Sequence, residues 1–207
     1  MNRALVIAII SLTAITWLIT AISFGLPTTW IGAARPFLTA VTVSTAFLFI
    51  FDRWLWGLKG LRCWIAKTPN LKGAWRLELQ SNYVDPDTGN QVHRTGYAQI
   101  DQRANTLIVR IFTENSKSKT YSWAIDSDDH VFSLAIVYDN QPRIMDRQNR
   151  SHAHQGAAVF SFRGYRPKEL RGEYWTERPT LGEMRLFERQ DADINSYEEG
   201  TSLYGDD

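Results

Sequence analysis

The sequence predicts a membrane-anchored all-β protein, in which an N-terminal two-helix transmembrane hairpin precedes a small eight-stranded antiparallel, lipocalin-like β-barrel. Three observations predict this fold. Two long apolar runs lie within the first 56 of the 207 residues, and from Gly73 onward apolar and polar residues alternate in eight short runs. The charge divides at the same place, because residues 1–67 hold six bases and one acid whereas residues 68–207 hold 17 bases and 21 acids.

The first apolar run, Ala4 to Leu26, has 23 residues without an ionisable side chain. As a helix it would extend about 34 Å, which exceeds the ~30 Å hydrocarbon core of a bilayer. A cleaved signal peptide is the alternative, but its apolar region would be only about 7–15 residues long.

The second run, Phe37 to Phe51, has 15 residues and must recruit residues 31–36 or the Trp54 end to cross a membrane. Hydroxyl residues recur in both runs and either bond across the helix pair or bond their own backbone.

Basic residues flank the outer ends of the two runs, and Arg35 alone lies between them. The positive-inside rule therefore places both termini in the cytoplasm. We expect a two-helix transmembrane region at 1–56 and a basic juxtamembrane linker at 57–70, which is either a plain linker or a short helix on the anionic inner leaflet. The single cysteine, Cys63, cannot form an intramolecular disulfide, which favours a reducing compartment.

The β-barrel domain is expected at 71–190, followed by an acidic, disordered tail at 191–207. An open sandwich is the alternative to the barrel. The alternation begins with Trp75, Leu77 and Leu79 and continues in seven further runs: Val92–Gln102, Thr106–Thr113, Lys119–Asp126, Val131–Tyr138, His152–Phe162, Leu170–Thr176 and Gly182–Arg189. In a meander of these strands, the loops at 83–91, 114–118, 139–151 and 177–181 share one end of the barrel, which we expect to carry the site.

Strand alternation also predicts which polar side chains point inward at that end. They are Ser81, Tyr83, Thr113, Tyr138, Asn140, His154, Thr176 and Arg178. Such a rim would suit a ligand with a phosphate or carboxylate for Arg178, planar rings for the tyrosines, and polar edges for the hydroxyl and amide groups.

Each candidate also has a purely structural explanation. Arg178 would pair with Glu177 or Glu173, and the two tyrosines would close the barrel as end plugs. His152 and His154 share a strand face, but too few further ligands accompany them to predict a metal site. Arg143, Arg147 and Arg150 bind an anion or balance nearby acids. No catalytic motif is recognised, so we expect neither an enzyme nor a cofactor other than the ligand.

Several short segments together resemble a known family. They are Thr68 to Trp75, Tyr138 to Pro142, His154 to Gly156 and Gly172 to Arg178, following two apolar runs. In this order they resemble the two-transmembrane β-barrel effectors of bacterial CBASS anti-phage systems. The resemblance implies a cyclic-dinucleotide receptor in the bacterial inner membrane, activated by the product of a cognate nucleotidyltransferase. It also implies that ligand binding drives self-association, membrane disruption and death of the infected cell.

The resemblance does not identify individual binding residues, so the candidate site comes from strand alternation alone. The alternative function is a membrane-anchored, lipocalin-like carrier or scaffold that holds a small apolar ligand. The two hypotheses differ at the end of the barrel. Convergence of Ser81, Asn140, Thr176 and Arg178 would favour a nucleotide, whereas a lumen sealed by Trp123, Phe132 and Phe160 with outward polar groups would favour the scaffold. The small net charge of the barrel argues against nucleic-acid polymers.

Overall fold

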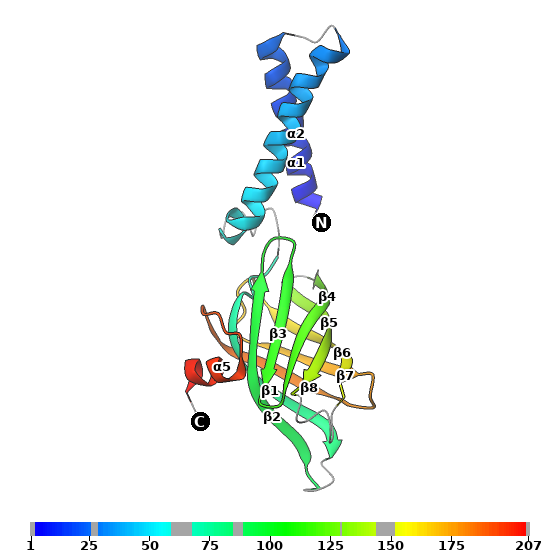
Figure 1. Ribbon diagram of the computed structural model, residues 1–207, viewed down its shortest axis with the longest axis vertical. Coiled ribbons are helices and arrows are strands. Elements are labelled where there is room, and N and C mark those ends of the chain that lie inside the picture. The colour runs from blue at the N-terminus through cyan, green and yellow to red at the C-terminus, as the bar shows by residue number, and fades with distance from the viewer. Residues whose placement is uncertain are drawn as a thin grey trace. The chain divides into compact units, whose positions relative to one another are not determined.

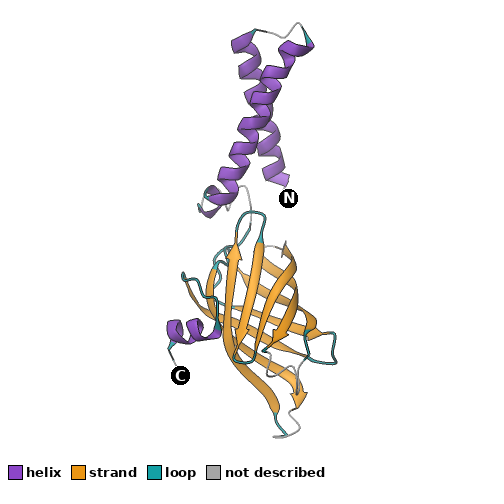
Figure 2. Ribbon diagram, viewed as in Figure 1, coloured by secondary structure: helices purple, strands orange, loops and turns teal. Residues whose placement is uncertain are grey.

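The computed structural model describes residues 3–25, 29–58, 68–84, 89–128, 130–143 and 152–205 (Figures 1 and 2). The chain divides into a helical N-terminal unit and a β-barrel unit. The expected linker helix, the basic residues between 59 and 67, and Cys63 lie outside the described residues.

The N-terminal unit is a pair of apolar helices, α1 (Arg3–Phe24) and α2 (Trp30–Arg53), followed by the short 3-10 helix η1 (Leu55–Gly57). Both contain a stretch long and apolar enough to cross a membrane, Val6–Ser23 and Ala34–Arg53. The second helix recruits residues 30–36, as its short apolar run requires. Its first turn is capped by Thr29, whose Oγ1 accepts a hydrogen bond of 3.1 Å from the Gly32 N–H.

Small residues form one part of the contact between α1 and α2. Ala21 and Ala40 are buried, and Ser44 of α2 shares a 2.7 Å hydrogen bond with Thr13 of α1. Other hydroxyls, such as those of Thr39 and Thr42, bond the carbonyl four residues earlier in their own helix. Close approach of small side chains, the Thr13–Ser44 hydrogen bond and the packing of Ile9 of α1 on the cluster around Phe51 therefore hold the described part of this pair together.

The second unit is a closed antiparallel barrel in which each strand pairs with the next and β8 pairs with β1, which confirms the predicted fold class. The strands are β1 (Gly73–Val84), β2 (Gln91–Gln102), β3 (Leu107–Thr113), β4 (Ser116–Asp128), β5 (Val131–Pro142), β6 (His154–Arg163), β7 (Leu170–Thr176) and β8 (Leu181–Gln190). Strand β5 extends four residues beyond its predicted end, because Ser116–Thr120 of β4 pair with it and lengthen the ladder.

Alternate residues of every strand point inward. Their apolar side chains fill the part of the barrel interior near the β2–β3 and β6–β7 connections. Trp75, Phe132 and Phe160 are among the largest fully buried ones. Phe132 stacks on Phe162 with ring centroids 5.7 Å apart and meets the edge of Tyr165 at 5.3 Å. This part of the barrel is a packed core, and such burial is the main source of its stability.

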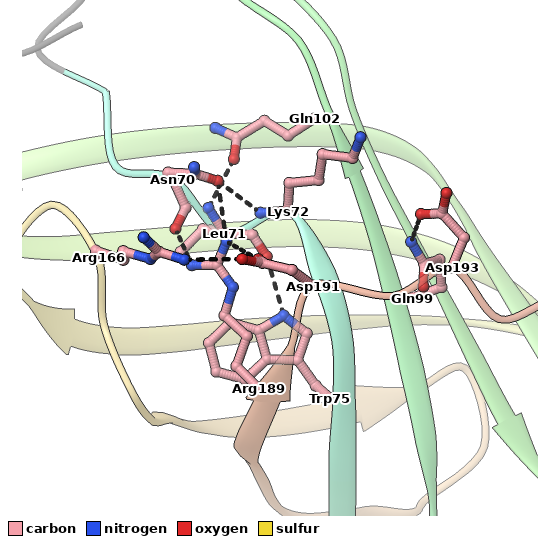
Figure 3. Close-up of polar contacts among 10 residues, drawn as sticks. All are labelled: Asn70, Leu71, Lys72, Trp75, Gln99, Gln102, Arg166, Arg189, Asp191 and Asp193. Atoms are coloured by element: carbon pink, nitrogen blue, oxygen red, sulfur yellow. Dashed lines mark hydrogen bonds and ion pairs between the residues drawn. The ribbon is translucent and has the colours of Figure 1, made fainter. Parts of the chain in front are cut away.

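A polar clamp fixes the segment before β1 across the end of the barrel that carries the β2–β3 and β6–β7 connections (Figure 3). The Trp75 indole N–H donates to the Leu71 carbonyl at 2.9 Å, and the Leu71 N–H donates to Gln102 Oε1 at 2.8 Å. Arg189 donates to the Asn70 carbonyl at 2.7 Å and lies over the Trp75 ring. These bonds satisfy the buried polar groups of a loop that would otherwise be costly to bury.

The residues after β8 form an ordered strap, which we define as residues 191–205, and it ends in α5 (Tyr197–Tyr204). Ile194 is buried against outward-facing Tyr97 and Phe112 of β2 and β3. Its N–H donates to Gln99 Oε1 at 3.1 Å, and the Gln99 amide donates to Asp193 at 3.0 Å. The strap therefore covers the outer wall of β1–β3.

The prediction of a disordered acidic tail is wrong for these residues. The acidic composition concealed a small set of apolar side chains, Ile194, Tyr197, Leu203 and Tyr204, that pack on the barrel wall. Tyr97 stacks on Tyr204 with centroids 5.5 Å apart. Burial of these rings offsets the entropy lost when the segment is ordered.

We expect Gly200→Val to detach the strap. A Cβ atom at Gly200 would lie 2.2 Å from the Tyr97 ring, so any side chain there overpacks the contact. The expected loss of unfolding free energy is about 1–3 kcal/mol, measured by denaturant unfolding of the full chain in detergent. Ser202→Val on the same helix is the control, because Ser202 is exposed. Equal denaturation midpoints for Gly200→Val and Ser202→Val would contradict the close packing of Gly200 against Tyr97.

Candidate functional site

The four connections β1–β2, β3–β4, β5–β6 and β7–β8 lie at the same end of the barrel, because all eight strands are antiparallel neighbours in sequence order. We call this end the mouth. It is the end at which the sequence predicted a site. The opposite end is closed by the clamp around Trp75, so a ligand inside the barrel would enter through the mouth.

Most of the candidate residues continue the inward faces of their strands toward the mouth. The pairing register places Tyr138 beside Gly156 and Thr120, Asn140 beside His154 and Ser118, and Thr176 beside Gly156. Thr113 pairs with Gly96 two positions beyond buried Ile111. The inward faces predicted for Ser81, Thr113, Tyr138, Asn140, His154 and Thr176 therefore agree with the observed register.

Two tyrosines lie across the interior just above the apolar core, each against a glycine of the next strand. Tyr138 is 4% exposed, and a Cβ at Gly156 would lie 2.6 Å from its ring and hydroxyl. Tyr174 is also buried, and a Cβ at Gly182 would lie 2.7 Å from its ring. Both glycines are thus required for space. The two rings form a floor that separates the packed core from the mouth.

Burial keeps both tyrosine hydroxyls protonated. Desolvation raises the pKa of Tyr138 far above its usual value, and the neighbouring Tyr174 adds to the effect. Burial also raises the pKa of Tyr174, while a hydrogen bond from Ser81 and the charge of Arg94 oppose the rise. At neutral pH the floor is therefore uncharged and presents phenol groups that can donate or accept hydrogen bonds.

The polar side chains around the floor differ in whether their hydrogen-bonding groups have partners. Ser81 is buried, contacts Tyr174 and accepts a hydrogen bond of 3.1 Å from the Tyr83 N–H, while Tyr83 itself is 52% exposed. Ser118 donates to Asn140 Oδ1 at 2.9 Å. Thr120 is 4% exposed, and its hydroxyl has no hydrogen-bond partner among the described residues. An orphaned buried hydroxyl is uncommon and costly.

Arg178 lies differently from its prediction. Strand β7 ends at Thr176, so Arg178 belongs to the turn rather than to the inward face of the strand. Its N–H donates to Thr176 Oγ1 at 3.2 Å, and its guanidinium donates to the His152 carbonyl. Neither predicted acid partner is used in this arrangement. Arg178 therefore ties the β7–β8 turn to His152, just before β6, at the edge of the mouth.

Sequence analysis missed Arg94 as a site residue. It pairs with Leu79 in the β1–β2 ladder and so occupies the inward face of β2, two positions beyond Gly96. Its side chain is exposed, lies near Tyr174, and has no ion-pair partner among the residues that the structure describes. The signal was present, because alternation from Ile100 through Ala98 and Gly96 leads to Arg94.

Two hollows mark the surface near these strands. One of about 380 Å³ lies beside the mouth and includes Arg94 and Thr113 in its lining, together with Tyr197 of the strap. A larger hollow of about 970 Å³ lies on the outer wall of β1, β2 and β6–β8, and Arg94 contributes to its lining as well. There Arg185 already pairs with Glu78 and Glu169. The charges on the outer wall neutralise one another, so the mouth is the better site for an anion.

The other basic and metal-ligating candidates contribute little to the mouth. Arg143 pairs with Glu198 of α5 at 2.6 Å, and Arg147 and Arg150 lie outside the described residues. In the part of the chain that the structure describes, no three His, Cys, Asp or Glu side chains lie close enough to hold a metal ion. His154 Nδ1 lies 3.1 Å from the His152 carbonyl.

We expect Thr120→Val to stabilise the barrel and Thr113→Val to destabilise it. The first removes a buried, unbonded hydroxyl, whereas the Thr113 hydroxyl accepts from the Ser116 N–H at 3.1 Å and shares a 2.9 Å bond with the Ser116 hydroxyl. Each change is expected to be about 1 kcal/mol. Chemical denaturation of the full chain in detergent measures both. Destabilisation by Thr120→Val would show that its hydroxyl is satisfied in solution.

Comparison with protein-family models finds a match over residues 66–188 to the family described as the Cap15 cyclic dinucleotide receptor domain. The match spans more than half of the chain and covers β1 to β7 and most of β8. A comparison with curated proteins finds no significant match.

Proposed function

Because the chain belongs to the Cap15 cyclic dinucleotide receptor domain family, we propose that its barrel binds a cyclic dinucleotide at the mouth, above the tyrosine floor. The observation that supports this position is Arg94, an inward-facing cation without an ion-pair partner among the described residues, beside an uncharged floor. A cyclic dinucleotide carries two phosphate charges and two planar bases. It would need a cation and flat or polar surfaces together, which this end of the barrel offers.

The candidate residues would take different roles according to their burial. Arg94 would pair with a phosphate, and exposed Tyr83 would stack on a base. Half-buried Asn140, His154 and Thr176 would bond polar edges of the bases or sugars. Buried Ser81, Thr113 and Tyr138 would set the depth of the site rather than contact most of the ligand. Arg178 would contact the second phosphate or hold the two mouth loops in place.

We propose further that the protein is a CBASS effector of the bacterial inner membrane with both termini in the cytoplasm. The two apolar helices support membrane anchoring. In this proposal a cognate nucleotidyltransferase supplies the ligand, binding promotes self-association, and the spans then disrupt the membrane and kill the infected cell. The protein acts as a receptor without a catalytic step of its own.

The apolar packing in the part of the barrel away from the mouth argues against the alternative that the protein is a carrier of an apolar ligand. Phe132 and Phe160 fill the interior together with Trp75, as the scaffold hypothesis expects, but they occupy the space that an apolar cargo would need. Asn140 and Thr176 lie on inward faces rather than on the outward faces that the scaffold hypothesis requires. The groups with spare bonding capacity are polar and lie at the mouth. This distribution favours a polar, charged ligand over an apolar one.

A screen of the detergent-solubilised full chain against a panel of cyclic dinucleotides tests the proposed ligand class. A ligand that binds only the folded state should raise the thermal midpoint in proportion to RT ln(1 + [L]/Kd). Linear dinucleotides and mononucleotides of the same bases are the matched controls. Equal shifts for cyclic and linear compounds, or no shift for any member, would contradict the proposal.

The membrane mechanism is tested by comparing the full chain with a variant that lacks residues 1–56. We expect the shortened chain to bind the same ligand but no longer to kill cells that produce it. Killing by the shortened chain would refute membrane disruption while leaving ligand binding intact.

A further inference from the structure

The barrel is closed between β3 and β4 by an unusually short ladder. Only three residue pairs join these strands, from Arg110–Lys119 to Phe112–Lys117, whereas twelve pairs join β4 to β5. The three pairs all lie toward the mouth, next to the β3–β4 turn. Beyond Lys119, β4 continues to pair with β5, whereas none of its described residues pairs with β3, although β3 still lies beside the first part of this segment.

The end of the ladder has a local cause. The β4–β5 register shifts between Thr120 and Ser122, and such a bulge turns a strand away from its neighbour. Strand β3 spans only Leu107–Thr113, so it is too short to pair with the whole of β4. We call residues 120–128 the β4 edge. In it Tyr121 is 57% exposed, and Ala124 is exposed as well.

An exposed strand edge presents backbone N–H and C=O groups that can pair with another strand. The bulge at its start and Asp126 and Asp128 near its end restrict such pairing, so that an uncharged segment, Ser122–Ile125, remains between them. A partner strand must therefore be short and must tolerate the flanking acids.

The β4 edge of a second copy meets these requirements. In an antiparallel pairing centred on Ala124, each Trp123 lies opposite Ile125 of the other copy, and each Ser122 lies opposite Asp126 of the other copy. The bulge leaves Trp123 and Ile125 on the inward face and Ser122, Ala124 and Asp126 on the outward face, so every opposed pair shares a face. Apolar residues meet apolar ones, a hydroxyl meets each carboxylate, and no two carboxylates are opposed.

We propose that the β4 edge is the surface through which two copies of this chain associate, by antiparallel pairing of their β4 strands about a two-fold axis. This inference deepens the proposed function and rests on it, since it names the surface used for self-association. A contact of a few residues is weak between free molecules. Anchoring in one membrane raises the effective concentration of the copies and makes such a contact effective.

Disulfide trapping of the full chain in liposomes tests the pairing. In a Cys63→Ser background, Ala124→Cys places a thiol at the two-fold axis, and Ser161→Cys places one at an exposed position on β6 as the control. With a mild oxidant we expect at least a ten-fold higher yield of covalent dimer from Ala124→Cys, both with a cyclic dinucleotide and, at high protein density, without it. Equal yields from the two variants would overturn the inference.

A second variant separates this inference from the proposed function. Ala124→Asp would bring two new carboxylates together at the axis, so we expect at least a ten-fold loss of self-association. The affinity for the ligand should be unchanged when both proteins are compared at a concentration so low that each is monomeric, because the two equilibria are coupled wherever the parent associates. Unchanged self-association with intact ligand binding would refute the β4 pairing alone. Absence of ligand binding in the unmodified chain would instead refute the proposed function, while the trapping at high density still tests the edge.

Discussion

Arg94→Ala is expected to weaken the binding of a cyclic dinucleotide by about 10- to 100-fold. A hydrogen bond to a charged group contributes about 1.5–3 kcal/mol, and 1.4 kcal/mol corresponds to a factor of ten in affinity. Arg94 has an exposed, inward-facing side chain and no described ion-pair partner, so its charge is available for a phosphate. Titration calorimetry of the full chain in detergent measures the change.

Three further substitutions make this result specific. Arg94→Lys should recover part of the affinity, because a lysine keeps the charge but loses the bidentate geometry. Arg171→Ala should have no effect, because Arg171 lies on the outer wall and pairs with Glu169. Arg178→Ala should cause a smaller loss than Arg94→Ala, since its guanidinium already bonds the His152 carbonyl. Equal affinity of the parent and Arg94→Ala would remove Arg94 from the site.

Trp75→Ala is expected to lower the unfolding free energy by about 3–5 kcal/mol, the typical cost of emptying a large buried aromatic site. Trp75 is 0% exposed, its indole N–H bonds the Leu71 carbonyl, and Arg189 lies over its ring. The substitution therefore removes core packing and also leaves the Leu71 carbonyl without its donor. Denaturant unfolding of the full chain in detergent, followed by far-UV circular dichroism, measures the loss.

Trp175→Ala is the matched control, because Trp175 lies on the outward face of β7 and is 49% exposed. We expect a change within about 0.5–1 kcal/mol for this exposed position. Similar losses for the two tryptophans would mean that the clamp at Trp75 does not stabilise the barrel.

The arrangement of the strands was predictable because the chemistry of the barrel is local. Trp75, Leu77 and Leu79 alternate with Arg76 and Glu78, and this period of two fixes both the strand and its buried face. Turn sequences separate the strands, and neighbouring antiparallel strands pair in order. The same alternation predicted that Ser81, Tyr138 and Asn140 face inward, which the register bears out.

Features that depend on contacts distant in sequence were not predictable in this way. The strap packs on the barrel because Ile194 contacts Tyr97 and Phe112, which lie about 80 to 100 residues before it in the chain. No local sequence pattern indicates such a contact. The position of Arg178 depends on a bond to His152 across two loops. The short β3–β4 ladder depends on a bulge whose sequence, Thr120-Tyr121-Ser122, resembles an ordinary strand.

The strap also sets the order in which the barrel wall can be completed during synthesis. Ribosomes add about 5–20 residues per second, so the strap emerges roughly 4–16 s after Phe112. During that interval Tyr97 and Phe112 lack the strap side chains that pack on them in the finished fold. The nascent barrel therefore exposes an aromatic patch on its outer wall until the last residues of the chain have been synthesised.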